Sequence, residues 1–257
     1  MKTEELHTLL SSVLEILEMM IASGAEIYRA EESARRILKA YGMARVDVYA
    51  TTSNIIVSVE TADGMVKTHT HRVSQISTDI EKVHRLNDLV RRVTLQTPDT
   101  ASLVAQIQAV KDTPQYPVWV TILFYGVIAA AFYLFFGGRN LLECAISFGL
   151  GIVTGLLTKT LDTINGNKFL VKFLCAFTSC MVTFLLKTLS VIDSVDYIII
   201  GNIMSLIPGV GLTNSLRDLF AGDSISGVLR LIEASLLALA IACGYIITTF
   251  IFGGAVI

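Results

Sequence analysis

The residues best suited to chemistry lie where an apolar run is broken by proline and glycine. The run that starts at Val195 reaches Pro208-Gly209-Val210-Gly211, and at membrane depth only protein or a water-filled cavity can satisfy the backbone groups that such a break leaves unpaired. A helix that restarts after Gly211 would direct free N–H groups into the cavity, where they attract carboxylates. Transporters place substrates at interrupted helices of this kind, so we expect a binding site for a small carboxylate here. Its candidate residues are Asn202, Ser205, Pro208, Gly209, Gly211, Thr213, Asn214 and Arg217.

Arg217 is the candidate for holding a substrate carboxylate, and the polar side chains around it would supply hydrogen bonds. The proline and glycines would shape the broken helix. The alternative is an ordinary cytoplasmic loop after a span, in which Arg217 simply follows the excess of positive charge on that side of a membrane.

Three carboxylates in or beside apolar segments are candidates for proton coupling. They are Asp218, Glu143 and Glu233. A charged carboxylate near the bilayer centre costs roughly 3 kcal/mol, so one retained there is a candidate to bind or relay protons. Glu143 and Glu233 lie near the ends of their apolar segments, and Arg230 is one helical turn from Glu233. Placement at the membrane interface is therefore the alternative for both.

A second charged segment, GAEIYRAEE at positions 24–32, lies near the amino terminus. Its candidate residues are Glu26, Tyr28, Arg29 and Glu32. Glu26 and Arg29 are three residues apart, as are Arg29 and Glu32, which is the spacing of neighbours on a helix. The segment is either the start of a helix with surface ion pairs or part of a functional site.

No catalytic residue, cofactor or metal site is predicted. His69 and His71 would share one face of a strand and could together hold a metal, but no cysteine or carboxylate lies near them at ligand spacing. The sequence has no nucleophile elbow, P-loop, HExxH or dinucleotide-binding motif, which weakens an enzymatic function. The four cysteines lie in the apolar part without metal-type spacing and are best interpreted as small hydrophobic residues.

The elements that must position these residues divide into a charged part and an apolar part. Residues 1–112 carry 28 of the 42 charged side chains and all four histidines, whereas the rest of the chain carries 15 of the 18 glycines. Hydrophobic residues make up 53% of the chain and charged residues only 16%, against about 25% in typical soluble proteins. A single water-soluble domain is therefore excluded. The net charge of −2, without a basic run, also excludes an electrostatic footprint for nucleic acid.

The apolar part, residues 114–257, is predicted to be a transmembrane domain. A spanning helix needs about 20 apolar residues. Five stretches qualify, near 118–136, 141–158, 169–190, 195–212 and 228–252. No cleavable signal is visible at the amino terminus, and with that end in the cytoplasm the connections receive five Lys or Arg inside against two outside. We expect a multi-pass protein of the cell (inner) membrane with a cytoplasmic amino terminus, although the weak fourth span decides the side of the carboxyl terminus.

Residues 1–113 are predicted to form a small α+β domain in the cytoplasm. Apolar residues at helical spacing run from Leu6 to Met20 and from Ala30 to Tyr41, where Gly42 would end the helix. Alternating patterns predict strands near 46–48, 55–59 and 65–73, with Asp63-Gly64 as a hairpin turn. Two more helices are expected near 78–94 and 99–111. The fold class is therefore an α-helical polytopic membrane protein with about five transmembrane helices, preceded by this domain.

The order of these parts and two segments, SGAEIYRAEES and SLIPGVGLTNSLRDLFAGDSISG, resemble the threonine/serine exporter (ThrE) family, and within it the YjjP-type subunit of the split form. The resemblance covers about Leu9 to Phe252. It implies export of small carboxylate metabolites, either threonine- and serine-type amino acids or succinate-type dicarboxylates, driven by the proton-motive force. Fused members continue into a second hydrophobic block, so the resemblance also implies a separate small membrane subunit (YjjB-type) as partner, in a higher-order hetero-oligomer.

Three functions remain open from the sequence. The first is the transporter subunit just described. The second is a membrane-anchored, hydrolase-like enzyme with its chemistry in residues 1–112. The third is a regulatory or scaffolding membrane subunit that gates or recruits a partner.

Overall fold

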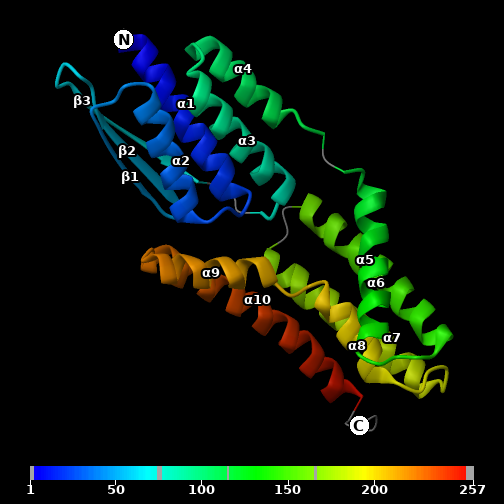
Figure 1. Cartoon of the computed structure of the whole chain (residues 1–257). Helices are drawn as coiled ribbons and strands as arrows, with labels where there is room; N and C mark the ends of the chain where they lie inside the picture. Colours follow the sequence, from blue (N-terminus) through cyan, green and yellow to red (C-terminus); the bar gives the residue numbers. More distant parts are fainter. Residues whose placement is uncertain (1–2, 74–76, 115, 165–166, 253–257) are drawn as a thin grey trace. The chain divides into compact units, whose positions relative to one another are not determined.

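The structure is a computed structural model of the 257-residue chain and describes residues 3–73, 77–114, 116–164 and 167–252. The described chain is mostly helical with one small sheet (Figure 1). In chain order the elements are α1 (Thr3–Ala22), α2 (Ile27–Ala40), β1 (Arg45–Ala50), β2 (Asn54–Glu60), β3 (Val66–Arg72), α3 (Ile80–Gln96), α4 (Thr100–Lys111), α5 (Val118–Phe135), α6 (Leu141–Thr163), α7 (Lys168–Thr188), α8 (Val195–Met204), α9 (Gly209–Ala221) and α10 (Ser224–Ile251). They form two compact units. The first comprises Met1–Pro114 and Gly209–Ile232, and the second comprises Gln115–Pro208 and Glu233–Ile257.

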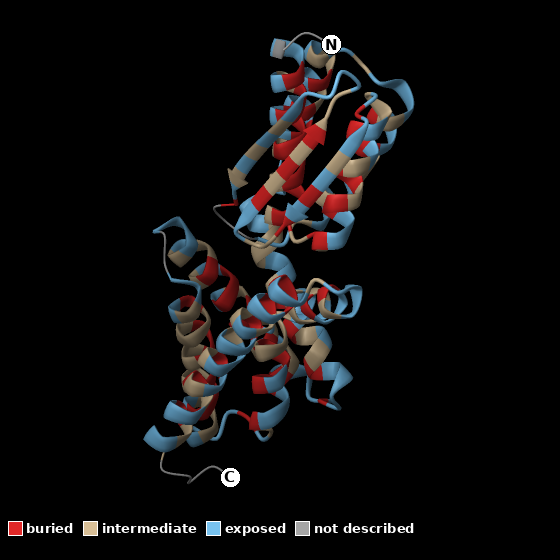
Figure 2. Cartoon of the chain, turned by 90° about the vertical axis from the view of Figure 1, so that its left-hand side faces the viewer, coloured by how far each residue is buried: buried red, intermediate tan, exposed pale blue. Residues whose placement is uncertain are grey.

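The first unit contains an antiparallel sheet with the strand order β1-β2-β3. Along the central strand the side chains of Ile55, Val57 and Val59 are buried, and the residues between them are partly exposed, so one face of the sheet joins the core (Figure 2). The apolar faces of α1 to α4 complete that core in a single hydrophobic cluster. One sheet face and four amphipathic helices therefore account for the hydrophobic pattern of the amino-terminal residues.

The helices and strands expected for residues 1–113 are confirmed. α2 ends at Ala40, and Gly42 just beyond it has a φ of +82°, the left-handed conformation that commonly follows a helix. The Asp63-Gly64 turn joins β2 to β3, with Val57 paired to His69 in the register. Local sequence patterns are sufficient to predict these elements, because both helical spacing and strand alternation involve residues that are near one another in the sequence.

A helical hairpin of α9 and the start of α10 also belongs to the first unit. Gly222, between the two helices, has a φ of +96°, and the N–H of Asp223 donates to the carbonyl of Asp218 at 2.9 Å. At Gly227 a Cβ would lie 2.7 Å from Cγ of Leu219 and 2.9 Å from its backbone nitrogen. The hairpin therefore depends on glycine both at its turn and where α10 approaches α9.

The second unit consists of α5 to α8 and the rest of α10. α5 and α6 approach closely through small residues. A Cβ on Gly151 would lie 2.6 Å from the carbonyl oxygen of Tyr125, and the hydroxyl of Ser147 donates to the carbonyl of Ala129 at 3.1 Å. Apolar clusters join the remaining helices, one of them formed by Cys180, Phe184, Val195 and Ile199.

Four described helices, α5, α6, α7 and α10, are long and apolar enough to cross a membrane. They correspond to the expected spans near 118–136, 141–158, 169–190 and 228–252, and α6 continues to Thr163. A fifth span results only if α8 and α9 count as one broken span.

The apolar run 195–212 is not one helix, because α8 ends at Met204 and α9 begins at Gly209. The expected restart after Gly211, at Leu212, is therefore wrong by three residues. Pro208 directly precedes α9, where its missing N–H costs no helical hydrogen bond, so the helix can begin at once. A boundary between the two compact units also lies at this break, between Pro208 and Gly209. The units divide the chain after Pro114, Pro208 and Ile232, whereas the sequence suggested one boundary near residue 113.

Candidate functional site

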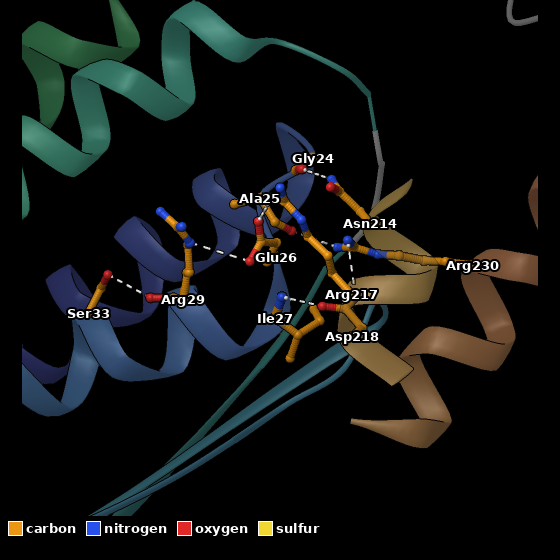
Figure 3. Close-up of polar contacts among 10 residues, drawn as sticks. All are labelled: Gly24, Ala25, Glu26, Ile27, Arg29, Ser33, Asn214, Arg217, Asp218 and Arg230. Atoms are coloured by element: carbon orange, nitrogen blue, oxygen red, sulfur yellow. Dashed lines mark hydrogen bonds and ion pairs between the residues drawn. The ribbon is translucent and has the colours of Figure 1, made fainter. Parts of the chain in front are cut away.

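A polar network in the first unit joins the loop between α1 and α2 to α9 and the start of α10 (Figure 3). We call it the loop–α9 network. Its members are Gly24, Ala25, Glu26, Ile27, Asn214, Arg217, Asp218 and Arg230. Glu26 and Arg217 are 191 residues apart in the sequence but are in direct contact. The network therefore unites the amino-terminal charged segment with part of the interrupted-helix segment.

Glu26 lies between two arginines. Its Oε1 accepts a hydrogen bond from Nη1 of Arg217, and its Oε2 lies 3.3 Å from Nε of Arg29, a pair that the spacing predicted. The side chains of Arg217 and Arg29 are 59% and 65% exposed, so these ion pairs contribute at most about 1 kcal/mol each to stability. Tyr28 is 51% exposed and Glu32 is half-buried on α2, and the described contacts place neither in the network. More than half of the Arg217 side chain therefore remains exposed to solvent.

Asp218 is buried and caps α2 from another helix. Its Oδ1 accepts from the N–H of Ile27, the first residue of α2, at 3.1 Å. The residue at the N-cap position of α2, Glu26, makes no such bond with its own side chain. The first N–H groups of a helix have no partner within it, and its positive end favours an anion. Asp218 meets both requirements.

Arg230 connects α10 to the same loop. Its Nη1 lies 3.2 Å from Oδ2 of Asp218, and its Nη2 donates to the carbonyl of Ala25 at 2.8 Å. The two side chains are only 6% and 1% exposed. Removing one partner of a buried ion pair leaves an uncompensated charge and costs about 3–5 kcal/mol. The Asp218–Arg230 pair is therefore the rigid part of the network.

Asn214 completes the network, because its Nδ2 donates to the carbonyl of Gly24 at 2.7 Å. Thr213 is exposed, and its hydroxyl donates to the carbonyl of Gly209 within α9 at 3.0 Å. Gly209 and Gly211 both lie in the first turn of that helix. Of the predicted substrate-binding residues in α9, Asn214 and Arg217 thus reach the loop, and the others shape or belong to the start of the helix.

Asn202, Ser205 and Pro208 belong to the second unit. Asn202 is buried, and its Nδ2 donates to Oγ of Ser147 at 3.2 Å and to the carbonyl of Ile198 at 3.0 Å. The hydroxyl of Ser205 donates to the carbonyl of Asn202 at 2.8 Å, one helical turn back. These three predicted residues are therefore not brought into the loop–α9 network.

Glu143 is a buried carboxylate in the second unit. Its Oε2 accepts from the hydroxyl of Tyr133 at 2.8 Å, and its Oε1 accepts from the N–H groups of Asp193 and Ser194 at 2.7 and 3.0 Å. Ser194 is the residue before α8. Glu143 therefore caps α8 from α6, as Asp218 caps α2 from α9.

Glu233 is the remaining candidate for proton coupling. Its Oε1 lies 4.0 Å from Nζ of Lys168, the first residue of α7, and its side chain is 41% exposed. Arg230, one turn earlier on α10, pairs with Asp218. The structure thus separates the three candidate carboxylates into three different environments.

Glu31 is a buried charged residue that the sequence analysis missed. Its Oε1 accepts from the N–H of Ala50 and its Oε2 from Nη2 of Arg35, both at 2.8 Å. Burial raises the pKa of Glu31, and the contacts from Ala50 and Arg35 oppose that rise. The signal was present, because Glu31 falls at helical spacing between the buried Ile27 and Leu38.

The paired histidines of β3 have separate partners. The ring of His69 packs edge-on against His7, with centroids 5.0 Å apart, and Nε2 of His71 lies 2.7 Å from Oε2 of Glu18. Burial, followed by the proximity of His7, lowers the pKa of His69. Among the described residues no group of three His, Cys, Asp or Glu side chains could hold a metal ion.

The groups in the loop–α9 network are those that proteins use to bind small carboxylates. An accessible guanidinium can hold a carboxylate through two parallel hydrogen bonds, and an amide such as that of Asn214 adds a further donor. The buried Asp218–Arg230 pair fixes the helix that carries them. Chemically, the arrangement is suited to recognition of an anion.

Comparisons with known proteins agree on one family. The model of the family described as "Putative threonine/serine exporter" (ThrE) matches residues 11–252. Two relatives named "Probable succinate transporter subunit YjjP" are each 25% identical. The one from Klebsiella aerogenes aligns with 91% of this chain and 90% of its own length, and the one from Escherichia coli K12 with 98% of both.

A longer relative, the "Probable threonine/serine exporter" of Mycobacterium tuberculosis, is 24% identical over 95% of this chain, which corresponds to 47% of its own length. No solved structure gives a significant match. The matched region contains the whole loop–α9 network.

Proposed function

The chain belongs to the threonine/serine exporter family, and we propose that it is a subunit of a secondary transporter that exports small carboxylate metabolites across the cell membrane. The cargo class consists of threonine- and serine-type amino acids or succinate-type dicarboxylates. The names of the relatives support both kinds of cargo, and four to five candidate membrane helices support a multi-pass protein.

The contact between Arg217 and Glu26 is the observation that carries this proposal. Arg217 binds a carboxylate through its guanidinium, yet more than half of its side chain stays exposed. A charged hydrogen bond of this kind contributes about 1.5–3 kcal/mol when it is protected from water. In our proposal Arg217 holds a carboxylate of the cargo, and Asn214 supplies a hydrogen bond beside it.

The proposal includes a partner and an energy source. We propose that a small hydrophobic membrane subunit of the same family (YjjB-type) completes the transporter, which is supported by the word "subunit" in the names of the two YjjP relatives. We further propose an inner-membrane location with a cytoplasmic amino terminus, and coupling to the proton-motive force through Asp218, Glu143 or Glu233. Glu233 is the most exposed of the three.

Counterflow in proteoliposomes tests the proposal. The full chain is reconstituted with and without the small subunit, and labelled threonine, serine and succinate are compared at two imposed pH gradients. We expect saturable counterflow of at least one of these solutes, stronger with the small subunit present. Arg217→Ala should raise the half-saturating concentration about tenfold or more, because a charged hydrogen bond is lost.

Arg85→Ala is the matched control for Arg217→Ala. Like Arg217, Arg85 is an exposed arginine that pairs with a carboxylate. Its partner is Glu81, one turn earlier on α3. We expect counterflow by this variant to equal that of the wild type. If Arg217→Ala transported as well as Arg85→Ala does, Arg217 would not bind the cargo.

A further inference from the structure

Glu26 presents to Arg217 the same chemical group that a carboxylate cargo would present. The Oε1 atom of Glu26 accepts a hydrogen bond from Nη1 of Arg217, whose side chain is 59% exposed. A carboxylate normally engages a guanidinium through two parallel hydrogen bonds, and the Nη1 donor that Glu26 occupies is one that a cargo carboxylate could use. Cargo and Glu26 would therefore draw on the N–H donors of one guanidinium, and the negative charge of Glu26 weakens the attraction of Arg217 for a second carboxylate.

The backbone of the same loop is held independently of Glu26. Asn214 donates to the carbonyl of Gly24, and Arg230 donates to the carbonyl of Ala25. Asp218 accepts from the N–H of Ile27. These contacts fix the loop on α9 and α10, so the Glu26 side chain can leave Arg217 without the loop leaving the helix hairpin.

A second arginine is ready to keep the displaced side chain paired. The Oε2 atom of Glu26 lies 3.3 Å from Nε of Arg29, which lies on α2 beside the network (Figure 3). Exchange of Glu26 for a cargo carboxylate on Arg217 would therefore leave no charge unpaired. The two arginines are largely exposed and Glu26 is 18% exposed, so the exchange should cost on the order of 1 kcal/mol.

We propose that Glu26 is an internal competitor for the cargo carboxylate at Arg217 and thereby sets the apparent affinity of the transporter for its cargo. The inference rests on the proposed function, in which Arg217 binds cargo. Glu26 yields Arg217 when cargo arrives and takes it back when cargo leaves, which lowers affinity and favours release. In this proposal the amino-terminal charged segment, residues 24–32, takes part in cargo binding through Glu26.

Removal of the competing charge is the direct test. In proteoliposomes with the full chain and its small subunit, Glu26→Gln should lower the half-saturating concentration for counterflow of labelled threonine or succinate about 2- to 5-fold, the range that corresponds to an exposed ion pair. Glu26→Asp, which keeps the charge but reaches less far, should lower it by a smaller factor. Glu81→Gln removes one carboxylate from an exposed pair on α3 and should leave the concentration unchanged.

The possible outcomes separate this inference from the proposed function. Unchanged or higher half-saturating concentrations in Glu26→Gln would overturn the role of Glu26. Glu26→Asp decides the same question if Glu26→Gln does not fold, as judged by its melting temperature. The proposed function fails separately, if the wild type shows no counterflow or if Arg217→Ala matches the wild type.

Discussion

Asp218 and Arg217 are neighbours in the sequence but lie in opposite environments. Asp218 is buried, caps α2 and pairs with Arg230. Arg217 is largely exposed and holds Glu26. A buried carboxylate that caps a helix and pairs with an arginine suits a structural role, whereas an exposed guanidinium can exchange partners. We therefore expect substitutions at the two positions to differ in kind, with Asp218 affecting stability and Arg217 affecting affinity for cargo.

Asp218→Ala should lower the free energy of unfolding by about 3–5 kcal/mol, because it leaves the Arg230 charge buried beside an uncapped helix. Denaturant unfolding of the full chain in detergent measures this change. Asp88→Ala, which removes a carboxylate from an exposed pair with Arg91, should cost less than about 1 kcal/mol. In Asp218→Leu/Arg230→Met much of the lost stability should return, and equal losses in single and double variants would contradict the buried ion pair.

Glu31 predicts a pH dependence of stability. Burial raises its pKa above the ordinary value of 4.5, so the folded chain binds this proton more tightly than the unfolded chain does. The stability that follows is fully present below pH 4.5 and is lost as the pH rises through the raised pKa of the folded state. Melting temperatures should therefore rise on acidification from pH 7, and Glu31→Gln should remove that component. If melting temperature depended on pH in the same way in Glu31→Gln and in the wild type, Glu31 would not be the source of this pH dependence. Glu81→Gln is the control and should keep the wild-type profile.

At the scale of elements, each unit contains a helix that is capped from outside. Asp218 of α9 caps α2, and Glu143 of α6 caps α8. Neither α2 nor α8 has a side-chain cap bond from its own N-cap residue. Such caps link elements that lie far apart in the sequence, so they fix tertiary structure as well as helix ends.

Gly227 tests the close approach of α10 to α9. A Cβ there would meet Leu219 at 2.7 Å, so Gly227→Ala must separate the two helices and should destabilise the chain by about 1–3 kcal/mol. Gly149 on α6 has no atom within 4 Å of the corresponding position, and Gly149→Ala should be neutral or stabilising by up to about 1 kcal/mol. Thermal unfolding of the two variants makes the comparison. Equal melting temperatures would show that the hairpin does not need this glycine.

The elements were predictable from the sequence to the extent that they depend on local spacing. The buried alternation of β2 and the helical spacing of α1 repeat every two or 3.6 residues, and the structure confirms both. The end of α8 and the start of α9 were less predictable, because an apolar run with Pro208 near its end is compatible with a helix that stops at several positions. The structure ends α8 at Met204 and begins α9 at Gly209.

At the scale of the whole molecule, the distribution of charge is explained only in part by a soluble segment joined to a membrane segment. The first unit also takes in Gly209–Ile232, which carries Arg217, Asp218 and Arg230. α10 begins in that unit and continues into the second as one helix. Charged residues of the carboxyl-terminal part thus gather with the amino-terminal domain.

The two segments that form the loop–α9 network can be identified from the sequence, but their contact cannot. Both charged segments were recognisable, because their residue types are unusual for their surroundings. Their contact was not, since Glu26 and Arg217 are 191 residues apart and spacing rules reach only one or two helical turns. For the same reason the sequence showed only that Arg230 is one helical turn from Glu233, and the contact of Arg230 with Asp218 emerged from the structure.

The central claim is that Arg217 binds cargo in competition with Glu26, and a double-mutant cycle on counterflow tests it most directly. The half-saturating concentration for labelled threonine or succinate is measured in the wild type, Glu26→Gln, Arg217→Gln and the double variant, each with the small subunit. We predict that Glu26→Gln lowers this concentration in the wild-type background and has no effect when Arg217 is already replaced. An equal effect of Glu26→Gln in both backgrounds would contradict the claim.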